Sequence, residues 1–325
     1  MKKLSILLLF LTSFTASADP LKIALVLDRG GKDDKSFNSA AFRGATEAKE
    51  KLGIFLKEVE VSEDNLYEPA MKSFAQKKFD LIIAIGVSQS EAVKKLAKEN
   101  PNQKFAIVDA KVDAPNVVSM VFEEQEGSYL VGYVAGLKSA TGKVGFIGGM
   151  DIPLIRRFEM AYSQGAKAAK PGTQVLTNYI GVTSEAWNNP TKGKELAQSQ
   201  YGQGADIIFT AAGASNNGVF DASEAQKKFT IGCDSNQNWI KPGLVMTSML
   251  KRVDTAVYQT IEDVTKGKFV GGVHTFGLKN NGIDWALDDN NKKLFNEAEI
   301  KKINSVRTAI VAGKIKVDDY YKKKK

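Results

Sequence analysis

The sequence is poor in the residues from which catalytic and metal sites are most often built. It has one cysteine, Cys233, and one histidine, His274, among 325 residues. A single cysteine cannot form an internal disulfide, and one cysteine with one histidine cannot build a zinc-type site. A hydrolase triad lacks support because no Gly-x-Ser-x-Gly segment occurs, and neither a P-loop nor a dinucleotide-binding glycine pattern is present. We therefore expect no enzyme activity, no metal and no cofactor.

Long apolar runs are also missing, except at the start of the chain. Lys2-Lys3 is a short basic region, residues 4–14 are almost unbroken apolar, and Ala16-Ser17-Ala18 supplies small residues for cleavage. This order predicts a secretory signal peptide over residues 1–18. A membrane anchor is the alternative, but the run is too short to span a bilayer of about 30 Å. We expect a periplasmic protein without a lipid anchor, because Cys233 lies far from the cleavage site.

Charge of one sign is not concentrated on any segment that would suit nucleic acid. The net charge is +8 and the isoelectric point about 9.2, and part of the excess sits in the tail Lys322–Lys325. The other lysines are spread among acidic residues rather than gathered in a patch with aromatic residues. We therefore expect no nucleic-acid partner and interpret the tail as a solvated end.

What the sequence does contain is an internal repeat. Phe37, six residues, Gly44-Ala45 and Ala48 are matched by Phe158, six residues, Gly165-Ala166 and Ala169. Two further landmarks recur in the same order: an apolar run that starts at an aspartate and leads to a glycine (80–86 and 206–213), and a strand-like run that ends in an aspartate (105–109 and 229–234). Two similar lobes on one chain imply a cleft between them, where a small ligand would bind.

The hydrophobic pattern predicts alternating strands and helices in both halves. Continuous apolar runs such as 22–28 are typical of buried parallel strands, and Ser36 and Gly53 bound a predicted helix from Phe37. Alternation of this kind predicts α/β lobes with parallel sheets and right-handed crossovers. The expected strands are 22–28, 59–61, 81–85, 105–108, 117–122, 144–147, 174–179, 207–210, 230–233, 245–251 and 274–278. The expected helices are 37–52, 69–77, 90–99, 127–138, 155–169, 192–203, 219–226, 253–266 and 297–312.

Candidate ligand-binding residues stand where these predicted strands end, since ligands of open parallel sheets bind at the carboxyl ends of the strands. Four acids, Asp28, Asp109, Asp151 and Asp234, follow such strands and would form a polar rim suited to hydroxyl groups. Each of them alone is more often an ordinary turn or cap residue. Phe37 and Asn38 start the helix beside Asp28, so we expect them at the same rim; core packing is the alternative for Phe37.

Two further candidates lie in the second half. Trp187 stands in the polar loop 183–192, where nothing periodic requires a core residue, and its ring could stack on a flat ligand. A lid over the core of its own lobe is the alternative. Lys251 ends a strand that connects the lobes, where its cation could reach a ligand oxygen, and a solvated lysine is the alternative.

These residues fall within segments that resemble a known family. Asp28-Arg29-Gly30-Gly31-Lys32-Asp33-Asp34-Lys35-Ser36-Phe37-Asn38 resembles the opening signature of the Bmp family, the basic membrane proteins and purine nucleoside receptors that serve ABC importers. Gly148-Gly149-Met150-Asp151 is similar to a second specific block of that family. Supporting similarity runs through 126–132, 141–153, 204–209, 231–234 and 247–251.

The resemblance implies a type I periplasmic-binding fold, with two Rossmann-like lobes joined by three crossover strands. We expect lobe 1 to comprise residues 19–121 and 251–275, and lobe 2 residues 122–250 and 276–325. The protein would be a monomer that delivers a nucleoside, with a purine favoured, to an ABC permease. Binding of a sugar or other polyol is one alternative, ligand sensing for a membrane signalling partner is another, and an exported enzyme is a third.

The resemblance also implies roles for nine ligand-binding residues. Phe37 and Trp187 would sandwich the base, Asn38 and Asp109 would bond to its edges, and Asp234 and Lys251 would hold the ribose hydroxyls. Asp28 and the backbones of Gly86 and Gly213 would lie nearby.

Overall fold

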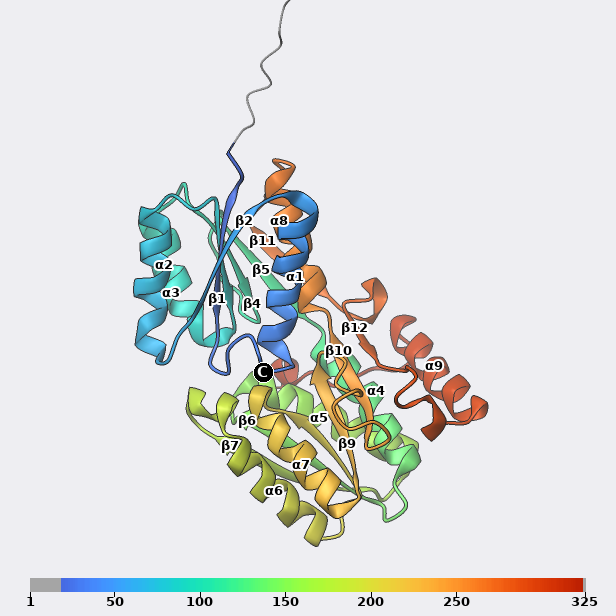
Figure 1. The fold of residues 1–325 in the computed structure, drawn as a ribbon. Coiled ribbons are helices and arrows are strands. Elements are labelled where there is room, and N and C mark those ends of the chain that lie inside the picture. The colour runs from blue at the N-terminus through green and yellow to red at the C-terminus, as the bar shows by residue number, and fades with distance from the viewer. Residues whose placement is uncertain (1–18, 324–325) are drawn as a thin grey trace, which may run out of the picture.

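Two six-stranded sheets, one in each half of the molecule, form the framework (Figure 1). The structure is a computed structural model and describes residues 19–323, so the predicted signal peptide lies outside the described residues. The first sheet has the strand order β11-β5-β4-β3-β1-β2, and all its neighbouring strands are parallel. Its strands are β1 (Lys22–Leu27), β2 (Phe55–Glu60), β3 (Leu81–Ile85), β4 (Lys104–Val108), β5 (Val117–Phe122) and β11 (Gly272–Phe276).

The second sheet has the corresponding order, β12-β10-β9-β8-β6-β7. Its strands are β6 (Lys143–Met150), β7 (Gln174–Gly181), β8 (Ile207–Ala211), β9 (Phe229–Asp234), β10 (Val245–Lys251) and β12 (Ile283–Trp285). All pairs are parallel except β10 with β12, which is antiparallel. The prediction of parallel sheets is therefore confirmed but for β12, a three-residue strand too short to show a period in the sequence.

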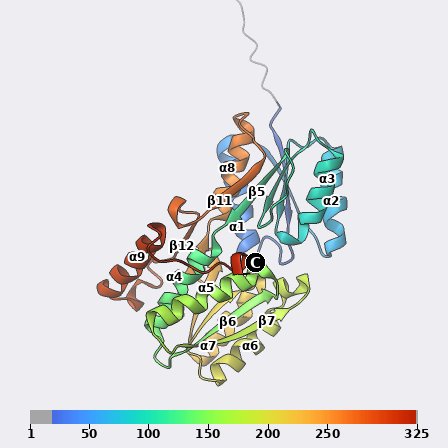
Figure 2. The ribbon, with the colours of Figure 1, turned by 180° about the vertical axis from the view of Figure 1, so that it is seen from behind.

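Helices cover both faces of each sheet (Figures 1 and 2). The first sheet carries α1 (Phe37–Leu52) and α8 (Val253–Thr265) on one face, and α2 (Tyr67–Gln76) and α3 (Ser90–Glu99) on the other. The second carries α4 (Glu124–Lys138) and α5 (Pro153–Ala169) opposite α6 (Pro190–Gly202) and α7 (Asn216–Gln226). The helix α9 (Glu297–Val311) packs on α4, and the short α10 (Tyr320–Lys323) packs on α5. On each sheet the helices shield the central strands, such as β3 and β8, in which every residue is buried.

Helix ends follow local chemistry. The helix α1 stops where Gly53 takes the left-handed conformation, with φ 67°, as the sequence predicts. The helix α4 begins at Glu124, three residues before the predicted start, because Glu124 and Glu126 are favourable in a first turn. This extra turn brings Glu124 into a buried position that matters below.

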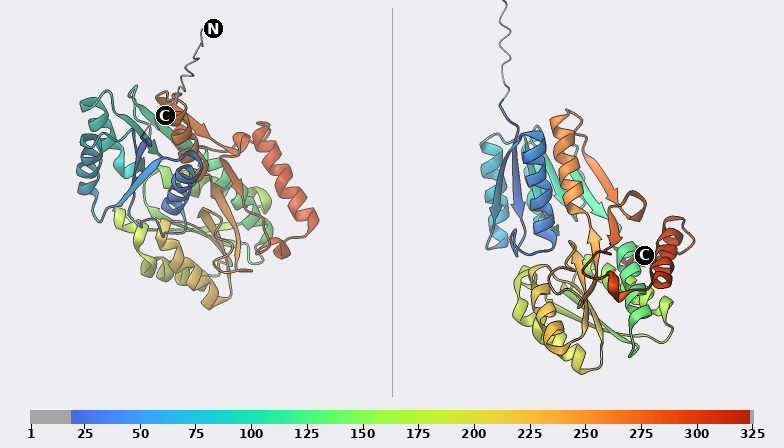
Figure 3. Two further views of the ribbon diagram at one scale, coloured as in Figure 1. Left: turned by 45° about the horizontal axis from the view of Figure 1, so that its top comes forward. Right: turned by 45° about the vertical axis from the view of Figure 1, so that its right-hand side comes forward.

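Three segments carry the chain between the sheets, and they lie beside one another (Figure 3). They run from β5 into α4, from β10 into α8, and from β11 into β12. The amide of Glu123 donates to the carbonyl of Phe276 at 2.8 Å, and the amide of Arg252 to that of Gly282 at 2.9 Å. The lobe boundaries that we predict near residues 121, 250 and 275 remain our proposal for the division of the chain. Among residues 19–323, no helix is long and apolar enough to cross a membrane.

Candidate functional site

A cavity lies between the carboxyl ends of the strands of the two sheets. It encloses about 550 Å³, the solvent at its mouth included. All nine predicted ligand-binding residues line it, although they come from eight separate stretches of the chain: Asp28, Phe37, Asn38, Gly86, Asp109, Trp187, Gly213, Asp234 and Lys251. The structure thus brings the whole predicted set together. Their roles toward a ligand stay a prediction.

Asp28 follows β1 and is held on several sides. One carboxylate oxygen accepts from the amide of Arg29 at 2.8 Å and from the hydroxyl of the buried Tyr67 in a short bond. The other oxygen faces Gly86, whose φ is 111°; a Cβ at Gly86 would lie 2.2 Å from it. Burial raises the pKa of Asp28 to about 6, although the bond from Tyr67 opposes this rise. Glycine at position 86 is therefore required both for the backbone conformation and for the space.

The start of α1 is organised by Asp34 rather than by Ser36. Ser36 occupies the N-cap position as predicted, but its side chain makes no capping bond. The carboxylate of Asp34 instead accepts from the amides of Ser36, Asn38 and Ser39 at 2.8–3.0 Å. Ser36 thus bounds the helix as predicted, but a nearby acid, rather than its hydroxyl, satisfies the free amides of the first turn.

The side-chain amide of Asn38 is engaged within the protein. Its oxygen accepts from the amide of Asp28 at 2.8 Å, and its nitrogen donates to the carbonyl of Arg29 at 3.3 Å and to Asp34 at 3.1 Å. Both amide protons thus have partners, and one oxygen lone pair is left for a further bond. Asn38 joins the β1 end to the α1 start and shapes this wall of the cavity.

Asp109 and Asp234 occupy matching places in the two halves. Both end their strands in the left-handed conformation, with φ 69° and 65°, which turns each side chain out of the sheet. One oxygen of Asp109 pairs with the ammonium of Lys251 at 2.6 Å, while the other is buried and has no partner among the described residues. Asp234 accepts from the hydroxyl of Ser36, across the cleft, at 2.7 Å.

Burial raises the pKa of both carboxyls. For Asp109 the attraction of Lys251 opposes the rise and the charge of Glu124 adds to it, which leaves a pKa of about 7. For Asp234 the attraction of Lys251 and the bond from Ser36 oppose the rise. Burial therefore destabilises the charged form of each carboxyl, and a ligand that donates a hydrogen bond would stabilise it.

Lys251 is the central cation of the cavity. It is 1% exposed, so the alternative of a solvated lysine is wrong. Its ammonium lies 2.6 Å from Asp109 and 3.3 Å from Glu124. It also lies 5.2 Å from the ring centre of Phe37, 5.1 Å from that of Phe122 and 5.7 Å from that of Phe158. Burial lowers the pKa of Lys251, but the surrounding carboxylates outweigh this, and the pKa lies above its usual value. The lysine is charged.

Trp187 stands in the short helical segment η3 (Ser184–Asn188) and reaches the cavity from the second lobe. Its indole lies against Gly149, where a Cβ would come within 2.1 Å of the ring. The ring also packs against the apolar core, which extends through both halves, so both interpretations of this residue have a basis. Its indole nitrogen is buried and has no partner among the described residues.

The predicted rim is correct for three acids and wrong for one. Asp151 does not line the cavity; its exposed carboxylate pairs with Arg156 at 2.7 Å. The cavity also contains residues that we did not predict: Arg29, Asp34, Val87, Leu154, Ile155, Phe158, Ala211 and Cys233. The repeat itself could have identified Phe158, since it is the partner of Phe37 in the aligned halves. Cys233 is buried at a strand end.

Comparison with known proteins agrees with this architecture. A solved ABC transporter solute-binding protein from Aeropyrum pernix shares the fold with a TM-score of 0.85 and 29% identity, over 91% of this chain and 93% of the other. The fold is therefore the type I periplasmic-binding fold. A Lactococcus lactis protein named "ABC transporter nucleoside-binding protein BmpA" is 35% identical over 91% of this chain and 89% of its own length.

One relative carries a name that differs from an expectation. A Pyrococcus furiosus protein is 34% identical over 83% of this chain and 71% of its own length, and it is named "Uncharacterized lipoprotein". The name describes that relative as lipid-anchored, whereas we expect no lipid anchor in this chain. In this chain the one cysteine is Cys233, which is buried in β9.

The strongest comparison is with a family rather than with a single protein. Residues 21–320 match the Bmp family, described as "ABC transporter substrate-binding protein PnrA-like". The match covers almost every residue that the structure describes, both sheets included. With the fold and the relatives above, it leads to one conclusion: this chain belongs to the Bmp family of ABC transporter substrate-binding proteins.

Proposed function

We propose that this protein captures a nucleoside, with a purine base favoured, in the cavity between its lobes and delivers it to the permease of an ABC importer. The observation that carries the proposal is that aromatic rings from both lobes, Phe37 and Trp187, line one cavity together with carboxylates and a buried lysine. Aromatic rings suit the faces of a base, and the charged groups suit its edges and the sugar hydroxyls.

The polar groups divide between the two parts of such a ligand. Asp109 has a buried oxygen without a partner among the described residues, which suits an N–H donor on a base edge, and Asn38 adds one acceptor lone pair. Asp234 and Lys251 would hold the ribose hydroxyls, with Asp28, Gly86 and Gly213 beside them. An orphaned buried acceptor costs free energy, on the order of 1–3 kcal/mol, so a ligand that satisfies it gains affinity.

The context of the protein supports delivery to a permease. The family is one of substrate-binding proteins of ABC transporters, and one relative is named as nucleoside-binding. The pattern of residues 1–18 is that of a chain exported to the periplasm. The protein would act there as a monomer, without nucleic acid and without catalysis.

Ligand screening tests the proposal directly. Thermal unfolding is measured with nucleosides, free bases and sugars, since a ligand at a hundredfold excess over its dissociation constant stabilises the fold by about 2.7 kcal/mol. We expect the largest shift with a purine nucleoside. A preference for a free sugar over every nucleoside would refute the proposed ligand and favour the sugar alternative. A sensor-kinase gene beside this one, in place of permease genes, would favour the signalling alternative.

Two variants then test the residue roles by calorimetry. Trp187→Ala should weaken nucleoside binding by roughly 5- to 150-fold, because stacking contributes on the order of 1–3 kcal/mol per base. Trp239→Ala is the matched control, since this tryptophan is 55% exposed and does not line the cavity. Asp234→Ala should weaken a nucleoside far more than its free base. Equal losses for the two would show that Asp234 does not hold the ribose.

A further inference from the structure

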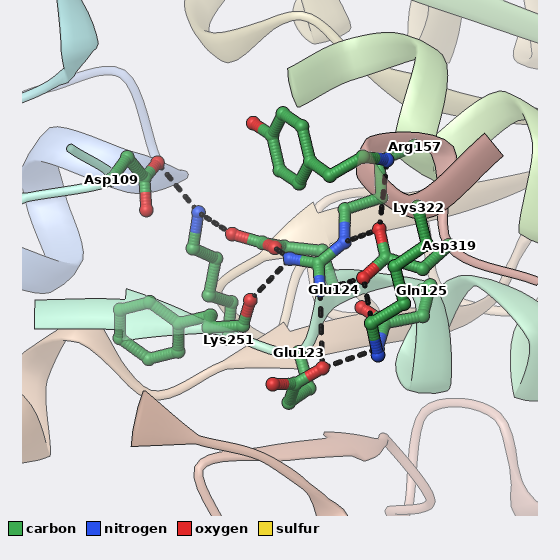
Figure 4. Close-up of polar contacts among 10 residues, drawn as sticks. Asp109, Glu123, Glu124, Gln125, Arg157, Lys251, Asp319 and Lys322 are labelled. Atoms are coloured by element: carbon green, nitrogen blue, oxygen red, sulfur yellow. Dashed lines mark hydrogen bonds and ion pairs between the residues drawn. The ribbon is translucent and has the colours of Figure 1, made fainter. Parts of the chain in front are cut away.

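A second buried cation lies beyond the cavity, in contact with three carboxylates (Figure 4). Arg157 of α5 is 7% exposed and does not line the cavity. Its guanidinium donates to Glu124 at 2.5 Å, to Glu123 at 3.1 Å and to Asp319 at 3.0 Å. The carbonyl of Phe122 accepts another bond at 2.7 Å. Four acceptors around one guanidinium fix its position more firmly than a lysine could be fixed.

Glu124 connects this cation with the ligand cavity. One of its carboxylate oxygens accepts from Arg157, and the other lies 3.3 Å from the ammonium of Lys251. Glu124 is 1% exposed, so water does not screen either interaction. Asp109, Lys251, Glu124, Arg157 and Asp319 therefore form an unbroken row of alternating charges that begins inside the cavity and ends at the C-terminal segment (Figure 4).

The row crosses the place where the chain passes between the sheets. Glu123 and Glu124 belong to the first connecting segment, and Lys251 begins the second. At the far end, Asp319 precedes α10, and the ring of Tyr321 lies 5.3 Å from the guanidinium of Arg157. The C-terminal segment thus holds Arg157 from outside, while Arg157 holds Glu124 from inside.

The energetics of buried charges make this arrangement consequential. Removal of one member of a buried ion pair leaves its partner uncompensated, which is strongly destabilising. Without Arg157, the buried Glu124 would keep, among the described residues, only its ion pair with Lys251. The flexible lysine ammonium would then shift toward Glu124, away from Asp109 and from the cavity.

We propose that Arg157 is a positioning residue for the bound ligand. It engages Glu124 so that Lys251 stays against Asp109 at the cavity, and the C-terminal segment holds Arg157 through Asp319. This inference rests on the proposed function, because a ligand in the cavity is what Lys251 would be positioned for.

A double-mutant cycle tests the inference by calorimetry with the tightest nucleoside found for the unchanged protein. Arg157→Gln should weaken binding at least tenfold. The matched control is Arg156→Gln, the same change at the next residue of α5, where the side chain is 39% exposed and pairs with the exposed Asp151. This control should stay within twofold of the unchanged protein.

The second change in the cycle separates positioning from a merely structural role. If Arg157 acts through Glu124, then Arg157→Gln combined with Glu124→Gln should bind within threefold of Glu124→Gln alone, because Lys251 is no longer drawn from Asp109. A double variant that binds more than threefold more weakly than Glu124→Gln alone would overturn the inference, and so would a single Arg157→Gln variant with unchanged affinity. Should Arg157→Gln fail to fold, Asp319→Asn takes its place. It should weaken binding two- to fivefold, and unchanged affinity would count against the inference.

A measurement without ligand keeps the inference distinct from the proposed function. If the unchanged protein binds no nucleoside, the proposed function fails by itself. A crystal structure of the ligand-free Arg157→Gln variant, or of Asp319→Asn in its place, then decides the inference. The Lys251–Asp109 contact, 2.6 Å in the present structure, should lengthen beyond the hydrogen-bond limit of about 3.5 Å. An unchanged contact would overturn the inference.

Discussion

The two halves of this protein share one scaffold and differ at the ends of its strands. Their sheets have corresponding strand orders, and each half has a glycine after one strand and a left-handed aspartate after the next. Asp28 and Asp151, however, occupy different environments. Asp28 is buried at the cavity, whereas Asp151 is exposed and paired with Arg156. The two halves therefore share their framework, whereas the loops after the strands differ and place only one of these two aspartates at the cavity.

The paired aromatic and acidic residues differ in the same way. Phe37 is half-buried at the start of α1, whereas Phe158 is 2% exposed and belongs to the apolar core as well as to the cavity. Asp109 is paired with a cation, whereas Asp234 is held by the hydroxyl of Ser36. Equivalent positions therefore carry unequal shares of stability and binding, and that inequality can be tested.

The largest effect is expected where the two phenylalanines are truncated. Phe158→Ala should destabilise the fold by about 3–5 kcal/mol, since it leaves a cavity in the core. Phe37→Ala should cost much less stability but weaken nucleoside binding by roughly 5- to 150-fold, through the loss of stacking. Urea unfolding and calorimetry on both variants measure the contrast. Equal losses of stability would show that the two copies are alike after all.

The two glycines should differ next. Gly86→Ala should destabilise the fold by about 3 kcal/mol, because a φ of 111° is a region that few residues other than glycine occupy and the new Cβ would meet Asp28. Gly213→Ala should cost about 1 kcal/mol, since its φ of 59° is left-handed helical and its new Cβ would lie 3.1 Å from the nearest atom. Urea unfolding compares them. A Gly86→Ala variant as stable as Gly213→Ala would contradict the close approach to Asp28.

Asp28 and Asp151 should differ in how they affect the pH dependence of the free energy of unfolding. Burial raises the pKa of Asp28 from 3.8 to about 6. A raised folded-state pKa adds stability at low pH that is lost as the pH rises through about 6. Between pH 5 and pH 8 this loss is on the order of 1 kcal/mol, and Asp28→Asn should not suffer it. The free-energy difference between variant and unchanged protein should therefore favour the variant more at pH 8.

Asp151→Asn serves as the control for that measurement. Its carboxylate is exposed and belongs to a surface ion pair, of the kind that contributes about 0–1 kcal/mol. The variant should follow the unchanged protein in urea unfolding at both pH values. A stability difference between Asp28→Asn and the unchanged protein that does not change with pH would show that Asp28 does not titrate in this range.

The smallest effect is expected across the cleft. Ser36→Ala removes the hydroxyl that donates to Asp234 at 2.7 Å and leaves that oxygen without this donor. The loss should be about 1 kcal/mol in the free energy of unfolding. Ser39→Ala is the control, because its hydroxyl donates to the carbonyl of Ser36 beside the start of α1 rather than across the cleft. Equal effects of the two variants would show that the bond between the lobes contributes nothing of its own.

The sequence by itself determined the framework of this protein. Continuous apolar runs and helical spacing predicted nearly every strand and helix within a few residues, because these patterns report local geometry and burial. The repeat predicted two similar halves with a cleft, and the strand ends located Asp28, Asp109 and Asp234 at one rim. The resemblance of 28–38 to a family signature completed a set of nine residues that the structure brings to one cavity.

Only the tertiary structure decided which charges and hydroxyls meet. Lys251 is buried against Asp109, 142 positions away, Ser36 bonds to Asp234, 198 positions away, and Arg157 meets Asp319, 162 positions away. No local pattern reports such contacts, because they depend on how the two sheets stand across the connecting segments. The arrangement of the two sheets also leaves Asp151 outside the cavity and places Phe158 in its wall. The hydrophobic period of a segment indicates which face of a helix or strand is buried. The residues that pack against that face are determined by the assembled fold.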